Sequence, residues 1–144
     1  MYESIGQITN QTNKKIIYFL NSKLEVFDIT LEQWNVLLKL SQENKINQKQ
    51  LAHKVDKDEP TLARILNILE RKGLVVRQPS KEDKRAFCLN LTDKGVSLKK
   101  KIEPFFGSLF EIIISGVAIE EIEIYKRVLM KINNNINIKH VGKK

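Results

Sequence analysis

The sequence contains one cysteine, Cys88, among its 144 residues. A single cysteine excludes a disulfide within one chain, and we expect a reducing compartment such as the cytoplasm. No apolar run is long enough to cross a bilayer, and residues 1–6 lack the basic-then-apolar order of a signal peptide. We therefore expect a cytoplasmic protein that makes no contact with membranes.

Residues for metal or acid–base chemistry are also scarce. Cys88 and two widely separated histidines are too few and too isolated for a zinc site. No glycine-rich phosphate loop is present. Carboxylates such as Glu32 and Glu70 fall at surface positions of expected helices, without partners for acid–base work. We therefore expect no catalytic residue, no metal and no cofactor, and hence no enzyme.

The chain does have what a folded domain needs. Hydrophobic residues make up 42% and charged residues 29%, which favours a folded chain over a disordered one. Its length suits one domain, and we see neither an internal repeat nor a linker. The formal net charge is +8, and residues 47–101 hold fourteen basic and seven acidic residues. This concentration of charge indicates an anionic partner for that segment.

Helix signals come first along the chain. An apolar pattern of helical period predicts a helix over 3–27. Thr30 and Gln33 have the spacing of a capping box and open a helix that buries Trp34. Asn47 and Gln50 have the same capping-box spacing and predict the start of a helix over 47–55.

The following helix, over 58–72, is the best defined. Asp58 is a suitable N-cap, Pro60 is tolerated in the first turn, and Gly73 stops the helix. At about 100° per residue two faces separate. The predicted buried face consists of Leu62, Ile65, Leu66 and Leu69, and the outward face of Pro60, Arg64, Asn67 and Arg71.

After Gly73 the apolar period changes to two, which predicts strands over 74–79 and 85–91 joined by a basic loop. Phe87, Leu89 and Leu91 form the expected inward face. A long helix follows from Thr92-Asp93, where Pro104 and Gly107 predict a bend. We expect a last helix near 119–135 and a frayed polar tail from residue 133. The fold class is mainly α with a small β-hairpin.

The order helix, turn, helix, hairpin can place one helix in the DNA major groove and a charged loop on the backbone. Arg64 can fork onto guanine and Asn67 onto adenine, while Arg71, near the helix end, could contact phosphate only. In the loop, Asp83 can pair with Arg85 and direct it toward a narrow minor groove. The predicted DNA-binding residues are Lys49, Gln50, Pro60, Thr61, Arg64, Asn67, Arg71, Lys81, Asp83, Lys84 and Arg85.

Over residues 29–95 the chain resembles the MarR family of winged-helix transcriptional regulators. The resemblance lies in the stretches ITLEQWNVLLKL, INQKQLAHKVDKDEPTLARILNILERKGLVVR and PSKEDKRAFCLNLTDKG. Asp56 stands where a glycine is common, Lys57 where an apolar residue is common, and Lys84 where arginine is common. Pro60 and Ala63 replace small hydroxyl residues. These departures bear on base preference rather than on DNA binding.

The resemblance implies a homodimer with interleaved terminal helices, acting on a pseudo-palindromic operator of double-stranded DNA. It also implies a repressor released by a small aromatic or anionic effector. We expect a single domain over 1–144, with a DNA-binding unit at 30–95 and dimerisation helices at 1–29 and 96–144. The flanking helices carry many apolar residues, including Ile112–Ile114, which a single chain could not fully bury. This also favours a dimer.

Three alternatives stay open at this point. The expected effector cleft is lined by Tyr18, Trp34, Phe105 and Phe106, but these rings could equally be ordinary core. A winged helix can also serve as a protein-interaction module without specific DNA binding. Finally, nearby cations could make Cys88 an oxidant sensor, although we favour an inert thiol there.

Overall fold

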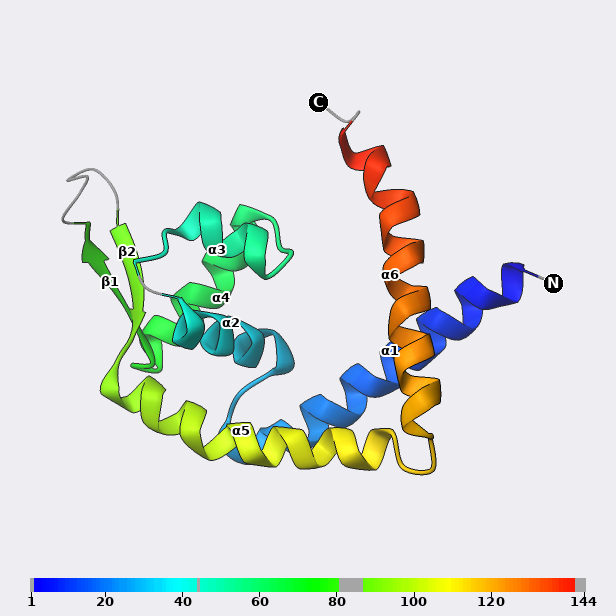
Figure 1. Ribbon diagram of the computed structural model, residues 1–144. Helices are drawn as coiled ribbons and strands as arrows, with labels where there is room; N and C mark the ends of the chain where they lie inside the picture. The colour runs from blue at the N-terminus through cyan, green and yellow to red at the C-terminus, as the bar shows by residue number, and fades with distance from the viewer. Residues whose placement is uncertain (1, 44, 81–86, 142–144) are drawn as a thin grey trace. The chain divides into compact units, whose positions relative to one another are not determined.

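The computed structural model describes residues 2–43, 45–80 and 87–141, with side chains as far as residue 137. Its elements follow the predicted order and confirm a mainly helical fold with a two-strand hairpin (Figure 1). They are α1 (Glu3–Leu24), a 3-10 turn η1 (Glu25–Phe27), α2 (Leu31–Gln42), α3 (Gln48–Lys54), α4 (Glu59–Arg71), β1 (Val75–Pro79), β2 (Phe87–Leu91), α5 (Asp93–Ile113) and α6 (Ile119–Val141).

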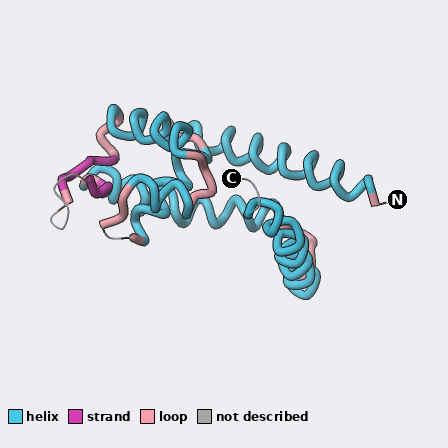
Figure 2. The backbone as a smooth tube through the Cα atoms, turned by 90° about the horizontal axis from the view of Figure 1, so that it is seen from above, coloured by secondary structure: helices cyan, strands magenta, loops and turns pink. Residues whose placement is uncertain are grey.

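The chain divides into two compact units, Met1–Leu109 and Phe110–Lys144. The first holds the elements from α1 to β2 and most of α5. Within it, Figure 2 shows α1 extending away from the strands, and residues 3–15 of this helix are exposed. The second holds the end of α5 and all of α6. None of its described hydrophobic residues is buried.

Side-chain caps begin the helices where the sequence places them. The Thr30 hydroxyl accepts the Gln33 N–H at 3.2 Å, and the Thr30 N–H donates to the Gln33 side chain at 3.1 Å. Asn47 and Gln50 form the same reciprocal pair at 2.8 and 3.0 Å. Asp58 accepts the Thr61 N–H at 2.7 Å. Each cap satisfies backbone donors that the first helical turn cannot satisfy itself.

The core of the first unit lies under α2, α3 and α4. Trp34 on α2 is 1% exposed, and the predicted inner face of α4 is at most 1% exposed at every position. Leu89 of β2 and Ile102 of α5 close the same cluster. A buried leucine or isoleucine contributes about 1.5–3 kcal/mol relative to an exposed one. Core packing therefore fixes which face of α4 is turned outward.

The hairpin pairs β1 and β2 antiparallel, with Val75 opposite Leu91 and Pro79 opposite Phe87. A bridge from Ile46 to Leu89 joins the hairpin to the segment before α3. The predicted inward position of Phe87 is wrong, because this residue begins β2 beyond the edge of the core and is 56% exposed. Leu89 is buried as predicted.

Two helix ends differ from expectation. The first helix ends at Leu24, and residues 25–27 form the 3-10 turn instead of a further α-helical turn. Helix α5 includes Pro104 and continues to Ile113, and the bend expected at Pro104 and Gly107 stays a prediction. The expected frayed tail from residue 133 is wrong, since α6 continues to Val141. Polar composition lowers helix propensity but does not end a helix that lacks a stop residue.

The turn between α3 and α4 requires a left-handed residue. Asp56 has φ of 57°, a conformation that aspartate adopts more readily than most residues other than glycine. This explains how aspartate can occupy a position where the resembling family commonly has glycine. The Lys57 N–H then donates to the Ala52 carbonyl at 3.0 Å and closes the turn.

Candidate nucleic-acid interface

Helix α4 presents the predicted outward face to solvent. Pro60, Arg64, Asn67 and Arg71 are all exposed, opposite the buried leucine and isoleucine face. Thr61 is partly buried and gives its backbone N–H to the Asp58 cap. Two guanidinium groups and an amide thus follow one helix face. Such groups can form bidentate hydrogen bonds with base edges.

Helix α3 adds a second exposed edge. Lys49 and Gln50 lie on its first turn, and both side chains are exposed. The Gln50 oxygen already accepts the Asn47 N–H, so this side chain has a structural role in capping. Lys49 offers a positive charge to an anionic surface.

Glu32 of α2 contacts the outward face of α4, an interaction that was not predicted from the sequence. Its Oε2 accepts from Lys57 Nζ at 3.1 Å, and its Oε1 lies 3.6 Å from the Arg64 guanidinium. The Lys57 hydrogen bond is the main cause that holds the pKa of Glu32 below its ordinary value of 4.5, with smaller coulombic help from both cations and opposition from burial. Lys57 stands at a position where the family commonly has an apolar residue, and this substitution was the sequence signal that could have indicated an acidic partner nearby.

Arg77 of β1 ties the hairpin to the two helices. Its guanidinium lies 3.4 Å from Glu70 Oε1 on α4 and donates to Gln48 Oε1 on α3 at 3.3 Å. Sequence analysis did not identify this residue. The predicted loop residues Lys81, Asp83, Lys84 and Arg85 lie outside the described residues.

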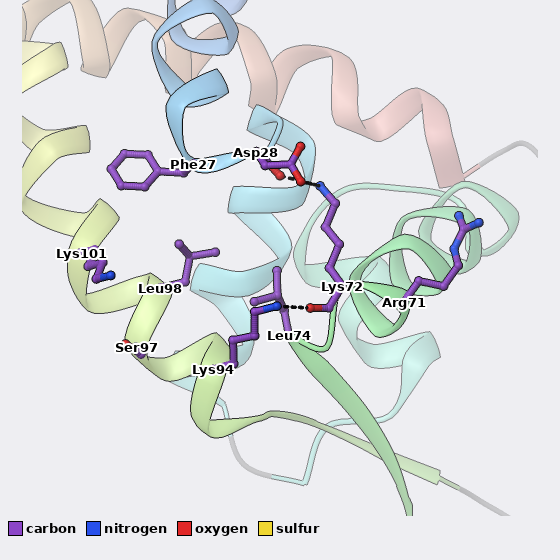
Figure 3. Close-up of a pocket in the computed structure, with 9 residues that line it drawn as sticks. All are labelled: Phe27, Asp28, Arg71, Lys72, Leu74, Lys94, Ser97, Leu98 and Lys101. Carbon is purple, nitrogen blue, oxygen red and sulfur yellow. Dashed lines mark hydrogen bonds and ion pairs between the residues drawn. The ribbon is translucent and has the colours of Figure 1, made fainter.

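The C-terminal end of α4 is anchored by lysine amines (Figure 3). Lys72 Nζ donates to the Asp28 carbonyl and to Gln33 Oε1, and it lies 3.8 Å from the Asp28 carboxylate. Lys94 Nζ, from the first turn of α5, donates to the Lys72 carbonyl at 2.8 Å. The helix end is thereby joined to the α1–α2 junction and to α5.

Around this junction lies an open pocket of about 570 Å³. Its floor is apolar, from Phe27, Leu74 and Leu98, and its rim carries basic groups that include Lys101 (Figure 3). The full lining is Phe27, Asp28, Arg71, Lys72, Leu74, Lys94, Ser97, Leu98 and Lys101. A pocket of this composition suits a small ligand with one apolar part and one acidic group.

The four aromatic residues of the expected effector cleft are divided between core and surface. Trp34 is fully buried and packs against Phe106 with ring centroids 5.6 Å apart. Phe105 packs edge-on against Phe27 at 5.3 Å. Tyr18 is 79% exposed. The buried Trp34 indole N–H has no hydrogen-bond partner among the residues that the structure describes. A ligand role for these four residues stays a prediction.

Other chemistry is limited in the described part of the chain. Cys88 is a free, partly exposed thiol on β2. Within residues 2–43, 45–80 and 87–137 no group of three metal-ligating side chains is placed to hold an ion. None of the helices in the described segments has both the length and the apolar character needed to cross a bilayer.

Comparison with known proteins agrees with this geometry. The MarR family model matches residues 29–87. The HTH-type transcriptional regulator SarZ of Staphylococcus haemolyticus is 32% identical over 118 residues, which cover 77% of this chain and 80% of SarZ.

Two solved structures are also similar to the whole fold. MepR of S. aureus, crystallised in complex with DNA, matches with a TM-score of 0.81 and 27% identity over 94% of this chain and 98% of MepR. A mutant MarR from E. coli, complexed with operator DNA, matches with a TM-score of 0.85 and 26% identity over 92% and 97% of the two chains. The chain therefore belongs to the MarR family of winged helix-turn-helix transcriptional regulators, which are not enzymes.

Proposed function

We propose that this protein represses transcription by binding a pseudo-palindromic operator as a homodimer, with α4 in the major groove of double-stranded DNA. The observation that carries the proposal is the exposed basic and amide face of α4, set opposite its buried face. Two similar regulators, MepR and a mutant MarR, were crystallised with DNA, which supports the same partner here. In this proposal residues 30–95 are the DNA-binding unit.

Each exposed residue then has a role that follows from its chemistry. Arg64 and Asn67 lie in the middle of the α4 face and read base edges. Arg71, at the last turn, and Lys49, on α3, contact phosphates. The predicted loop residues add phosphate and minor-groove contacts. A protein-interaction module would favour an acidic or apolar outward face on α4, and this one is basic and polar.

Arg64→Ala should reduce discrimination between the preferred duplex and single-base variants by about 1–3 kcal/mol at the position that Arg64 reads. Lys49→Ala is the matched control, because loss of a phosphate contact should weaken all duplexes by the same factor. Fluorescence anisotropy with a duplex enriched from a randomised pool measures both effects. If Arg64→Ala changed neither affinity nor discrimination, α4 would not be the reading element.

We propose that residues 1–29 and 96–144 form the dimer interface. Helix α6 supports this, because Tyr125, Val128, Ile132 and Ile136 follow one stripe and are each at least 40% exposed in the single chain. The unit Phe110–Lys144 is shorter than the about 40 residues that a chain usually needs to form its own core. A contiguous exposed apolar stripe is typical of an interaction surface.

Sedimentation at micromolar concentration should give about twice the chain mass of 16.7 kDa. Ile132→Glu should shift the protein toward the monomer, because the new carboxylate would lie in an apolar interface. Lys126→Glu, on the same helix, controls for charge. A wild-type protein that sediments as a monomer would contradict the dimer. It would also remove the reason for two half-sites one helical turn apart, about 34 Å.

We further propose that a small, partly apolar acid releases the protein from DNA. The basic-rimmed pocket supports such a ligand, with its apolar part on Phe27 and Leu98 and its acid group near Lys101. The ligand must prefer a DNA-incompetent conformation, since equal affinity for both conformations would shift nothing.

Salicylate should therefore weaken duplex binding, and Lys101→Gln should raise the salicylate concentration needed, with Lys100→Gln as the control on the same helix. Trp34 fluorescence provides a second measurement. If peroxide alone released the DNA and Cys88→Ser abolished that release, a redox regulator would replace the ligand-responsive one.

A further inference from the structure

Glu32 joins three elements of the winged unit through one carboxylate. It lies in the first turn of α2, while Lys57 belongs to the turn before α4 and Arg64 to the outward face of α4. One oxygen takes the Lys57 hydrogen bond at 3.1 Å, and the other lies 3.6 Å from Arg64. Lys57 and Arg64, both distant in sequence from Glu32, therefore share this one acidic partner.

The backbone that carries the Glu32 side chain is held at a fixed place relative to the core, although the side chain itself is 45% exposed. Its neighbours Gln33 and Trp34 are buried, and the Thr30–Gln33 capping box sets the backbone of the same turn. Lys57 is fixed as well, because its backbone N–H closes the turn after α3. Arg64, by contrast, has a 59% exposed side chain. A long arginine side chain loses about 2 kcal/mol of rotamer entropy when it is held in one conformation.

The pairing leaves Arg64 able to contact a base. A guanidinium has five N–H donors, so an ion pair at one terminal nitrogen leaves donors for guanine O6 and N7. Lys57 neutralises Glu32, so the group of three side chains keeps a net positive charge toward DNA. A glutamate carboxyl is ionised at neutral pH, and the Lys57 hydrogen bond lowers the pKa of Glu32 further.

We propose that Glu32 is a positioning residue for operator recognition, which holds Arg64 in the direction from which it reads a base. This rests on the proposed function, since it requires Arg64 to contact DNA. Glu32 itself contacts no base in this proposal. Because Glu32 already restricts the Arg64 side chain before DNA binds, Arg64 loses less rotamer entropy when it contacts its preferred base. The same ion pair disfavours side-chain directions that reach other bases.

The test measures discrimination rather than affinity alone. The probes are the duplex enriched from a randomised pool by the unchanged protein, and the variant duplex altered at the base pair whose discrimination Arg64→Ala abolishes. Glu32→Gln should lower the ratio of the two affinities by about two- to fivefold, the range that an exposed ion pair supplies. In an Arg64→Ala background, Glu32→Gln should leave the ratio unchanged.

Glu43→Gln is the matched control. Glu43 is the C-cap residue that follows the same helix, and it pairs with Lys54 at 3.4 Å. This variant therefore removes the same charge without touching Arg64. It should alter both affinities by one common factor. Thermal unfolding of each variant confirms that the fold persists.

The outcomes separate the inference from the proposed function. If the unchanged protein enriched no sequence, the proposed function would fail. If it discriminated and Glu32→Gln discriminated equally well, this inference alone would fail. It would fail equally if Glu32→Gln raised both affinities by one factor, because Glu32 would then act only as a charge that opposes DNA.

Discussion

Affinity for a preferred duplex should fall by at least about a thousandfold between 50 and 200 mM salt. Each chain carries a net +7 between residues 47 and 101, and the proposed dimer would present two such segments. A protein that makes six to ten phosphate contacts displaces a counterion at each, so log affinity falls linearly with log salt. Anisotropy titrations at five salt concentrations would give the slope.

Lys49→Ala tests the origin of that slope. Because each dimer loses two phosphate contacts, the slope should become shallower by about 1.8, at roughly 0.9 per contact. Asn67→Ala should leave the slope nearly unchanged, since an amide that reads a base displaces no counterion. A flat salt dependence of the wild-type protein would indicate a partner other than nucleic acid.

Gly95→Ala should destabilise the fold by about 3 kcal/mol, near the upper end of what overpacking costs. Gly95 is buried in the first turn of α5, and a Cβ there would lie 2.2 Å from the Leu74 carbonyl oxygen. That oxygen also accepts the Thr92 N–H at 3.0 Å. Both sides of the contact are therefore backbone, and the start of α5 would have to move away from β1.

Gly107→Ala is the control within the same helix. A Cβ at this glycine meets nothing within 4 Å, so the change should stabilise the helix by up to about 1 kcal/mol. Denaturant unfolding followed by circular dichroism compares the two variants. Equal stability of Gly95→Ala and Gly107→Ala would show that the contact with Leu74 relaxes without cost.

The sequence predicted the features that depend on near neighbours. Capping needs a side chain and a backbone N–H three residues apart, so the starts at Thr30, Asn47 and Asp58 could be placed from residue types alone. The two faces of α4 follow from helical period, and the burial of its leucines confirms them. The family resemblance then predicted the partner class and the fold.

Contacts between distant residues could not be predicted in this way. The pairing of Glu32 with Arg64 depends on how α2 crosses α4, and the ties of Arg77 depend on where the hairpin meets both helices. Whether the Phe87 side chain is buried depends on where the core ends along β2. The alternation of apolar and polar residues does not show where that is. The sequence likewise does not distinguish Gly95 from any other residue in a helix. Only the structure shows the Leu74 carbonyl next to it.

The lysine at the end of α4 has a consequence for covalent modification. The Lys72 ammonium faces three acceptors, the Asp28 carbonyl, the Asp28 carboxylate and the Gln33 side chain, as many as it has protons. Acetylation would leave one proton and no charge on that nitrogen. At most one acceptor could then keep its bond, so a single acetyl group would remove most of the connection between the end of α4 and the α1–α2 junction.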